Sequence, residues 1–147
     1  MLYIRLHGSC APEDSGLGMV RLKARYVLFE ILYPSPGTAV ADGKHVLQAL
    51  RSSIETNFGE LGTGRCQSTL AVRYYNPKTS SGIIRIAREQ APIVQGALTH
   101  LRQIKGSSVV VRVTHVSGTM KKCEQRAVAI RRAEIVRRHR QDTAKMK

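Results

Sequence analysis

One short run of residues, Ser117-Gly118-Thr119-Met120-Lys121-Lys122, is the clearest candidate for chemistry in this sequence. It marks the predicted start of a helix, where the helix dipole is positive and each lysine costs about 0.3–1 kcal/mol. Two lysines at such a position are explained if an anion binds among them and the free backbone N–H groups. We therefore expect a phosphate site at Lys121 and Lys122. The alternative is that both lysines are solvated and the cost is tolerated.

The sequence lacks the spacings that are typical of catalytic or metal sites. Its histidines are isolated, its acidic residues form no recognisable pair, and its three cysteines (Cys10, Cys66 and Cys123) form no CxxC motif. We therefore expect no catalytic residue, no metal site, no cofactor bound by the protein, and a reducing compartment. One alternative remains open, a small-molecule enzyme of the acylphosphatase type that uses Arg65 and Asn76, but fold analogy alone supports it weakly.

The charge of the chain favours a polyanionic partner. Its 147 residues include 24 Lys plus Arg against 10 Asp plus Glu, a formal net charge of +14. Residues 119–147 alone hold 10 basic and 3 acidic side chains. Nucleic acid is the first candidate for such a surface. A membrane-spanning segment is not expected, because no run approaches the roughly 18 apolar residues that cross a bilayer. A membrane surface is not expected as a partner either, because the apolar face of the last helix does not continue to its end.

Hydrophobic periodicity predicts the order β-α-β-β-α-β, followed by a further helix. Gly59 and Gly106 are expected to end the first two helices. Residues 1–18 are predicted to form an unstructured extension, 19–118 a folded domain, and 119–147 a basic C-terminal helix and tail. The expected strands are 22–33, 68–75, 83–88 and 108–116, and the expected helices are 41–58, 89–104 and 119–141.

This order indicates a ferredoxin-like α/β sandwich, the class that includes the RNA-recognition motif, with both helices on one face of a four-stranded antiparallel sheet. In the first strand, Val27, Phe29 and Ile31 point to one face, and Tyr26, Leu28 and Leu32 to the other. The third strand contains no aromatic residue, so base stacking on it is not expected, whereas arginine contacts to phosphate remain possible. The face without helices is expected to carry Arg73, Tyr75, Arg85 and Arg112.

The last helix has two different halves. Met120, Cys123, Ala127 and Ile130 form an apolar stripe over about three turns, which predicts packing on the domain or on a partner. Beyond this stripe, arginines point in several directions. This pattern suits a helix that binds a polyanion, whereas a membrane helix would keep its apolar face to its end.

Four segments, taken in order, resemble the Pop-five family of ribonuclease P/MRP protein subunits. Met19–Glu30 is similar to the family's N-terminus, Gly59–Gly62 to its loop after the first helix, Thr79–Arg85 to its T-S-x-G-I-I-R turn and strand, and Val116–Glu124 to its V-S-G-T-x-K-K-x-E segment. The resemblance covers about residues 19–130, and residues 1–18 have no counterpart in it.

The resemblance implies a non-catalytic subunit of a ribonucleoprotein whose RNA, with Mg²⁺, removes the 5′ leader from precursor tRNA. The related RNase MRP particle processes ribosomal RNA. It further implies a barrel-fold protein partner of the Rpp-thirty type and a location in the nucleus and nucleolus. A ribosomal or other RNA-scaffold protein would share the charge but not the four motifs.

Position and charge indicate which basic residues meet the RNA. Tyr26, Leu28 and Leu32, with Glu30, are either partner-facing or core residues, and the sequence leaves both possibilities open. The expected RNA contacts are Arg21, Lys23, Arg25, Lys78, Arg85, Lys121, Lys122, Arg126, Arg131 and Arg132.

Overall fold

A computed structural model describes residues 23–34 and 41–146 of the chain. The predicted extension (1–18) and Arg21 lie outside these residues. None of the helices in the described ranges combines the length and apolar character needed to span a bilayer. The elements are β1 (Ala24–Leu32), α1 (Gly43–Gln67), β2 (Ala71–Asn76), β3 (Ser81–Ala87), the 3₁₀ turn η1 (Arg88–Gln90), α2 (Ala91–His100), β4 (Gln103–Ile104), β5 (Ser107–Ser108), β6 (Val110–Ser117) and α3 (Met120–Lys145).

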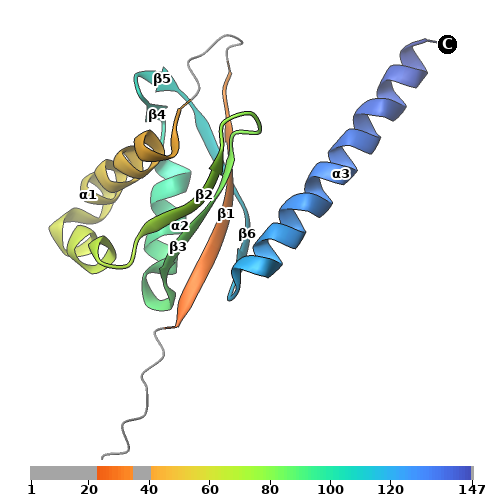
Figure 1. The fold of residues 1–147 in the computed structure, drawn as a ribbon. Helices are drawn as coiled ribbons and strands as arrows, with labels where there is room; N and C mark the ends of the chain where they lie inside the picture. Colours follow the sequence, from red (N-terminus) through yellow and green to blue (C-terminus); the bar gives the residue numbers. More distant parts are fainter. Residues whose placement is uncertain (1–22, 35–40, 147) are drawn as a thin grey trace, which may run out of the picture.

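The main sheet has the order β2-β3-β1-β6, and all of its neighbouring strands are antiparallel. Helices α1 and α2 cover one face, while α3 starts on the other side (Figure 1). This arrangement confirms the predicted ferredoxin-like sandwich with a separate C-terminal helix. The two helices pack on Val27, Phe29 and Ile31, which are almost fully buried, as their alternation in β1 predicts.

Helix α1 is longer than predicted. Asp42 caps it with a 2.8 Å bond from the Gly43 N–H to its carboxylate. Gly59 leaves the helical conformation (φ 68°, ψ −170°), as expected of a glycine stop, but helical geometry resumes and continues to Gln67. The predicted end of the helix at 58 was therefore wrong, because Gly62 and Gly64 tolerate helical geometry and the second segment buries Cys66.

Helix α2 is shorter than predicted, ending at His100 rather than at 104. Ile104 is buried, but it lies in a small β4–β5 hairpin. Lys105 and Gly106 form the turn of this hairpin, and both have positive φ (52° and 76°), as a two-residue type I′ turn requires. Gly106 therefore makes a hairpin turn and does not end a helix.

A β-bulge in β2 changes which side chains face the helices. Val72 pairs with Ile84 and Tyr74 with Ile83, which leaves Arg73 as an extra residue. The alternation shifts by one after a bulge. Tyr75 therefore faces the helix-covered core and stacks on Phe29, with ring centroids 6.3 Å apart. Its predicted position on the outer face was wrong.

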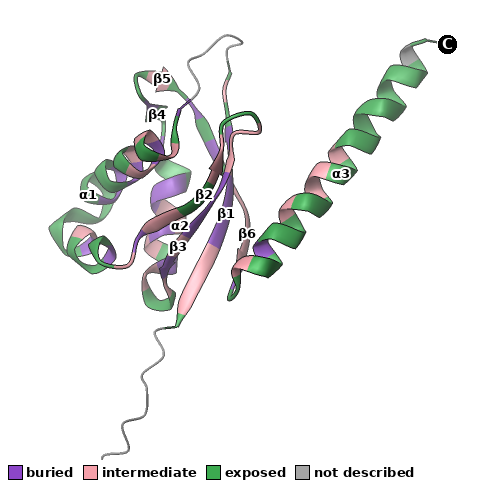
Figure 2. Cartoon of the chain, in the orientation of Figure 1, coloured by how far each residue is buried: buried purple, intermediate pink, exposed green. Residues whose placement is uncertain are grey.

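Helix α3 covers only part of the outer face of the sheet. Cys123 is fully buried there against Leu28 and Ile83, and Ala127 and Ile130 pack around them. The predicted apolar stripe is thus confirmed for Cys123, Ala127 and Ile130, and Leu28 proves to be a core residue beneath the chain's own helix. Beyond this contact α3 is mostly exposed (Figure 2).

Candidate nucleic-acid interface

The start of α3 is the predicted anion site. Thr119 precedes the helix in an extended conformation, and no side chain caps the first turn. The Thr119 N–H donates to Ser117 Oγ (3.3 Å), and the first intrahelical bond runs from the Cys123 N–H to the Thr119 carbonyl (3.4 Å). Lys121 and Lys122 are exposed beside this uncapped turn. The turn therefore presents positive side chains and the positive end of the helix dipole to solvent.

Arg25 lies next to this turn. Its Nη1 donates to the Ala24 carbonyl (3.3 Å) and lies 3.2 Å from the point that a Cβ on Gly118 would occupy. Glycine at 118 therefore leaves room for the guanidinium. Lys23 is exposed just before β1, and its carbonyl accepts a 2.8 Å bond from the Arg88 N–H.

Arg85 joins the same end of the sheet across the strands. Tyr26 in β1 pairs with Arg85 in β3 on one side and with Ser117 in β6 on the other. Arg85 therefore lies two strands from the start of α3 and is half-buried. We call this set the basic end. It comprises Lys23, Arg25, Arg85, Arg88, Lys121 and Lys122.

The basic end carries positive charge that no acidic side chain pairs with in the described residues. Among the described residues, no ion pair with an acidic side chain involves any of its six members. A bound polyanion could therefore neutralise the charge of all six side chains, because a surface of one charge sign attracts molecules of the opposite sign.

Other predicted RNA contacts lie away from the basic end. Lys78 is exposed in the β2–β3 turn, whose Ser80 carbonyl accepts a 2.7 Å bond from Ile31 at the far end of β1. Arg126 and Arg132 are exposed along α3. Arg131 pairs with Glu134 (3.2 Å), so part of its charge is already compensated.

Arg88 is the one member of the basic end that the sequence did not predict. It belongs there because its backbone bond to Lys23 joins the end of β3 to the beginning of β1. Only the strand register reveals this neighbour. The sequence alone shows only that Arg88 is the last residue of the predicted strand 83–88, which also contains Arg85.

The residues proposed for an acylphosphatase-type site do not come together. Arg65 is exposed in the last turn of α1, which leads into the beginning of β2. Asn76 ends β2, about 17 Å further along the strand, and its Oδ1 accepts a bond from the Lys78 N–H in its own turn (3.0 Å). This alternative, which needed both residues around one anion, was wrong.

The described cysteines are structural. Cys66 and Cys123 are buried free thiols, and burial raises the pKa of each above that of an ordinary thiol. In the described ranges, no three His, Cys, Asp or Glu side chains come together in a group that could hold a metal ion.

Comparison with known proteins identifies the family. The profile of the Rpp14/Pop5 family matches residues 25–128. The chain belongs to this family. The matched range includes every residue of the basic end except Lys23, together with Lys78 and Arg126, and it stops before Arg131 and Arg132.

Individual relatives agree with this assignment. The Ribonuclease P/MRP protein subunit POP5 of Schizosaccharomyces pombe is 37% identical over 127 residues, covering 80% of this chain and 91% of the relative. The Saccharomyces cerevisiae protein of that name is also 37% identical, covering 75% and 76%. Ribonuclease P protein component 2 of the archaeon Methanococcus aeolicus is 31% identical, covering 76% of each chain.

A solved structure supports the fold. One chain of the cryo-EM structure of yeast Ribonuclease MRP superposes with a TM-score of 0.54 at 12% identity, covering 78% of this chain and 92% of that chain. At this identity the likeness concerns the fold alone.

Proposed function

We propose that this chain is a non-catalytic protein subunit of ribonuclease P and RNase MRP and binds their RNA through the basic end. The observation that carries the proposal is a combination of two facts. The family profile covers residues 25–128, and the fold gathers basic side chains from β1, β3, η1 and α3, with Lys23 beside them, at one end of the sheet.

The chemistry of the basic end suits an RNA backbone better than an RNA base. Lysine and arginine side chains with free N–H groups at a helix start bind phosphate oxygens without reading sequence. Arg126, Arg132 and the exposed half of α3 extend the same electropositive surface along a helix of about 39 Å. The subunit would thereby support the structure of the RNA, while the RNA and Mg²⁺ perform the cleavage.

The proposal extends to the cellular context of the relatives. It includes precursor tRNA as the substrate of the assembled particle and rRNA processing by the MRP form. A barrel-fold subunit of the Rpp-thirty type is proposed as a protein neighbour, with the nucleus and nucleolus as the location.

Purification of the tagged full chain from cells tests the proposal. We expect the eluate to contain a structured RNA and to remove the 5′ leader from precursor tRNA. An eluate with neither RNA nor cleavage activity would refute the subunit assignment.

A double variant tests the basic end. Lys121→Ala/Lys122→Ala should reduce the co-purified RNA roughly tenfold if each lysine contacts a phosphate. Lys44→Ala is the matched control, because Lys44 is exposed in the first turn of α1, at a helix start that Asp42 caps. Equal RNA recovery from both variants would contradict a phosphate site at α3.

A further inference from the structure

Helix α3 projects away from the sheet (Figure 1). A cleft of about 300 Å³ lies between the helix and the outer face of β1 and β6. The strands contribute Glu30 and Arg112, and the helix contributes Ile130, Ala133, Glu134 and Arg137. None of the six residues of the basic end lines this cleft, and the cleft adjoins the small cluster that anchors α3.

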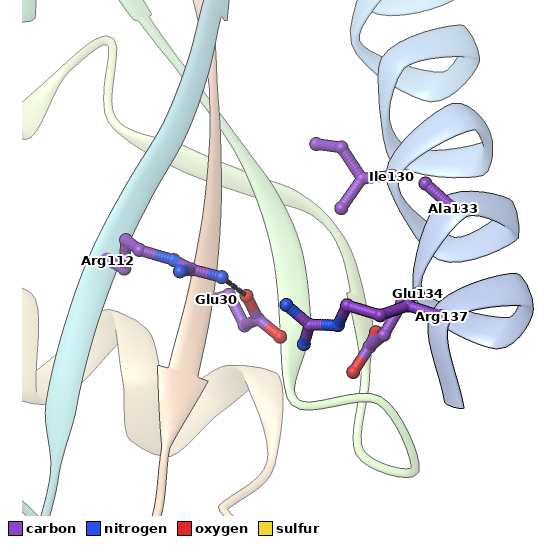
Figure 3. A pocket seen from close by; sticks show the side chains of 6 residues that line it. All are labelled: Glu30, Arg112, Ile130, Ala133, Glu134 and Arg137. Carbon is purple, nitrogen blue, oxygen red and sulfur yellow. Dashed lines mark hydrogen bonds and ion pairs between the residues drawn. The ribbon is translucent and has the colours of Figure 1, made fainter. Parts of the chain in front are cut away.

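Ion pairs fix the two walls of the cleft. Arg112 Nη2 donates to Glu30 Oε2 (2.7 Å) between the strands, and on α3 Arg138 Nη2 donates to Glu134 Oε1 (2.6 Å). Arg137 reaches from α3 toward Glu30 (Figure 3). Arg112 and Arg138 remain more than half exposed, so their guanidiniums retain free donors.

The floor of the cleft continues as an apolar strip. Leu32 and Val110 form the register pair next to Glu30 and Arg112, and they point to the same outer face. The inward neighbours Ile31 and Val111 are buried, whereas Leu32 and Val110 are 43% and 51% exposed. Two exposed, paired aliphatic side chains on the same sheet face as the cleft gain free energy when another apolar group covers them.

The composition of the cleft favours a protein occupant over RNA. Its described lining contains no aromatic ring for a base to stack on, and the Glu30 and Glu134 carboxylates repel phosphates. Four arginines (Arg112, Arg131, Arg137 and Arg138) surround these two carboxylates. The surplus positive charge complements carboxylates that flank an apolar side chain.

We propose that this cleft is a docking surface for an acidic, apolar segment of a partner protein. The segment places an apolar side chain over Leu32 and Val110, and its carboxylates pair with Arg112 and Arg137. The occupied cleft would hold the second half of α3 at a fixed angle to the sheet. This inference is independent of RNA binding at the basic end.

Site-specific photocrosslinking of the full chain in cells tests the occupant directly. With p-benzoylphenylalanine in place of Val110, we expect a crosslink to a protein peptide that contains aliphatic residues and at least two Asp or Glu. A crosslink to RNA, a crosslink to residues 1–22 of this chain, or no crosslink at all would overturn the proposal. Position 128 is the control, since Val128 is equally exposed on α3 but lies about 140° around the helix from Cys123 and about 160° from Ile130.

Substitutions that leave the core intact provide a second test. Using the crosslinker at Leu32, we expect Val110→Asp to reduce the yield about tenfold and Val128→Asp to change it less than twofold. Arg137→Glu should also reduce the yield, and Arg140→Glu, further along the exposed helix, should not. Unchanged yields with Val110→Asp and Arg137→Glu would contradict the proposal. Circular dichroism of each variant confirms that α3 remains helical.

Discussion

At the scale of single residues, Gly82 is the position in β3 where an aromatic ring packs directly against the strand backbone. A Cβ at this position would lie 2.8 Å from the Phe29 ring and 2.8 Å from the Tyr74 carbonyl. Only glycine lets the Phe29–Tyr75 stack approach the β3 backbone. The bulge at Arg73 brings Tyr75 to this face, so the glycine and the bulge depend on each other.

The first prediction concerns this position. Gly82→Ala should lower the free energy of unfolding by about 1–3 kcal/mol, because the methyl group displaces a buried ring or strains the backbone. Urea denaturation, followed by far-UV circular dichroism, measures the change.

Gly64→Ala is the control for this substitution. It lies in α1, where a Cβ would meet open space, so alanine should be neutral or should stabilise by up to about 1 kcal/mol. Equal effects of the two substitutions would contradict the close approach at Gly82.

At the scale of elements, α3 packs on the sheet through a much smaller apolar cluster than α1 and α2 do. Three buried residues, Leu28, Ile83 and Cys123, anchor it, whereas the helix-covered core joins nineteen. Local opening costs less where fewer apolar contacts break. The helix should therefore detach from the sheet without unfolding of the domain.

The second prediction uses the two buried thiols to detect this opening. Cys123 lies beneath α3 and Cys66 lies in the larger core, and burial raises the pKa of both thiols. The reactive thiolate is therefore scarce in the closed state at pH 8. In native buffer Cys123 should react with a thiol reagent at least about tenfold faster than Cys66, because α3 opens more often.

Mass spectrometry of the labelled peptides gives both rates in one sample. A Cys10→Ala background removes the third thiol. Equal rates at Cys66 and Cys123 would show that α3 opens only when the whole domain unfolds.

The elements also show how far local sequence determines the fold. Alternation in β1 and the stripe in α3 predicted the two faces of the sheet correctly, since burial dictates these periods. Periodicity could not predict the bulge at Arg73, whose cause is the pairing with β3, so Tyr75 was placed on the wrong face. Gly59 and Gly106 do adopt positive φ, but the helix ends predicted at them were wrong, because a helix resumes after Gly59 and Gly106 lies in a hairpin turn.

The candidate interface was partly predictable for a similar reason. Lys121 and Lys122 follow from the sequence of a helix start, and Arg25 lies at the second position of β1, within the strand predicted over 22–33. Their proximity to Arg85 and Arg88 depends on the strand register across β1, β3 and β6, which no local sequence pattern encodes. The cleft beneath α3 was not foreseen, because it results from the angle at which the helix leaves the sheet.

At the scale of the whole molecule, the two ends of the sheet differ in charge and in helix capping. The end where α3 begins carries the six residues of the basic end and an uncapped helix. The other end, where α1 begins, has its helix capped by the Asp42 carboxylate. A polyanion should therefore bind at the first end and extend along α3, which gives the protein a defined orientation on RNA.

The last prediction measures this orientation through counterion release. When a lysine contacts a phosphate, binding releases condensed cations, so the logarithm of the affinity falls with the logarithm of salt concentration by about 0.7–0.9 per contact. Removal of two such contacts in Lys121→Ala/Lys122→Ala should make the slope shallower by about 1.5. The affinity of the purified full chain for the catalytic domain of ribonuclease P RNA, between about 50 and 300 mM KCl, gives the slope.

Lys44→Ala at the opposite end removes an exposed lysine from a comparable helix position, and it should leave the slope within about 0.3 of the original. Net charge alone cannot produce this difference between the two variants. Long-range attraction weakens with each lysine removed, wherever that lysine lies, whereas the number of phosphate contacts falls only when the lysine lies where the RNA binds. A slope that falls in proportion to the number of lysines removed, irrespective of position, would therefore show that RNA binding is not localised at the basic end.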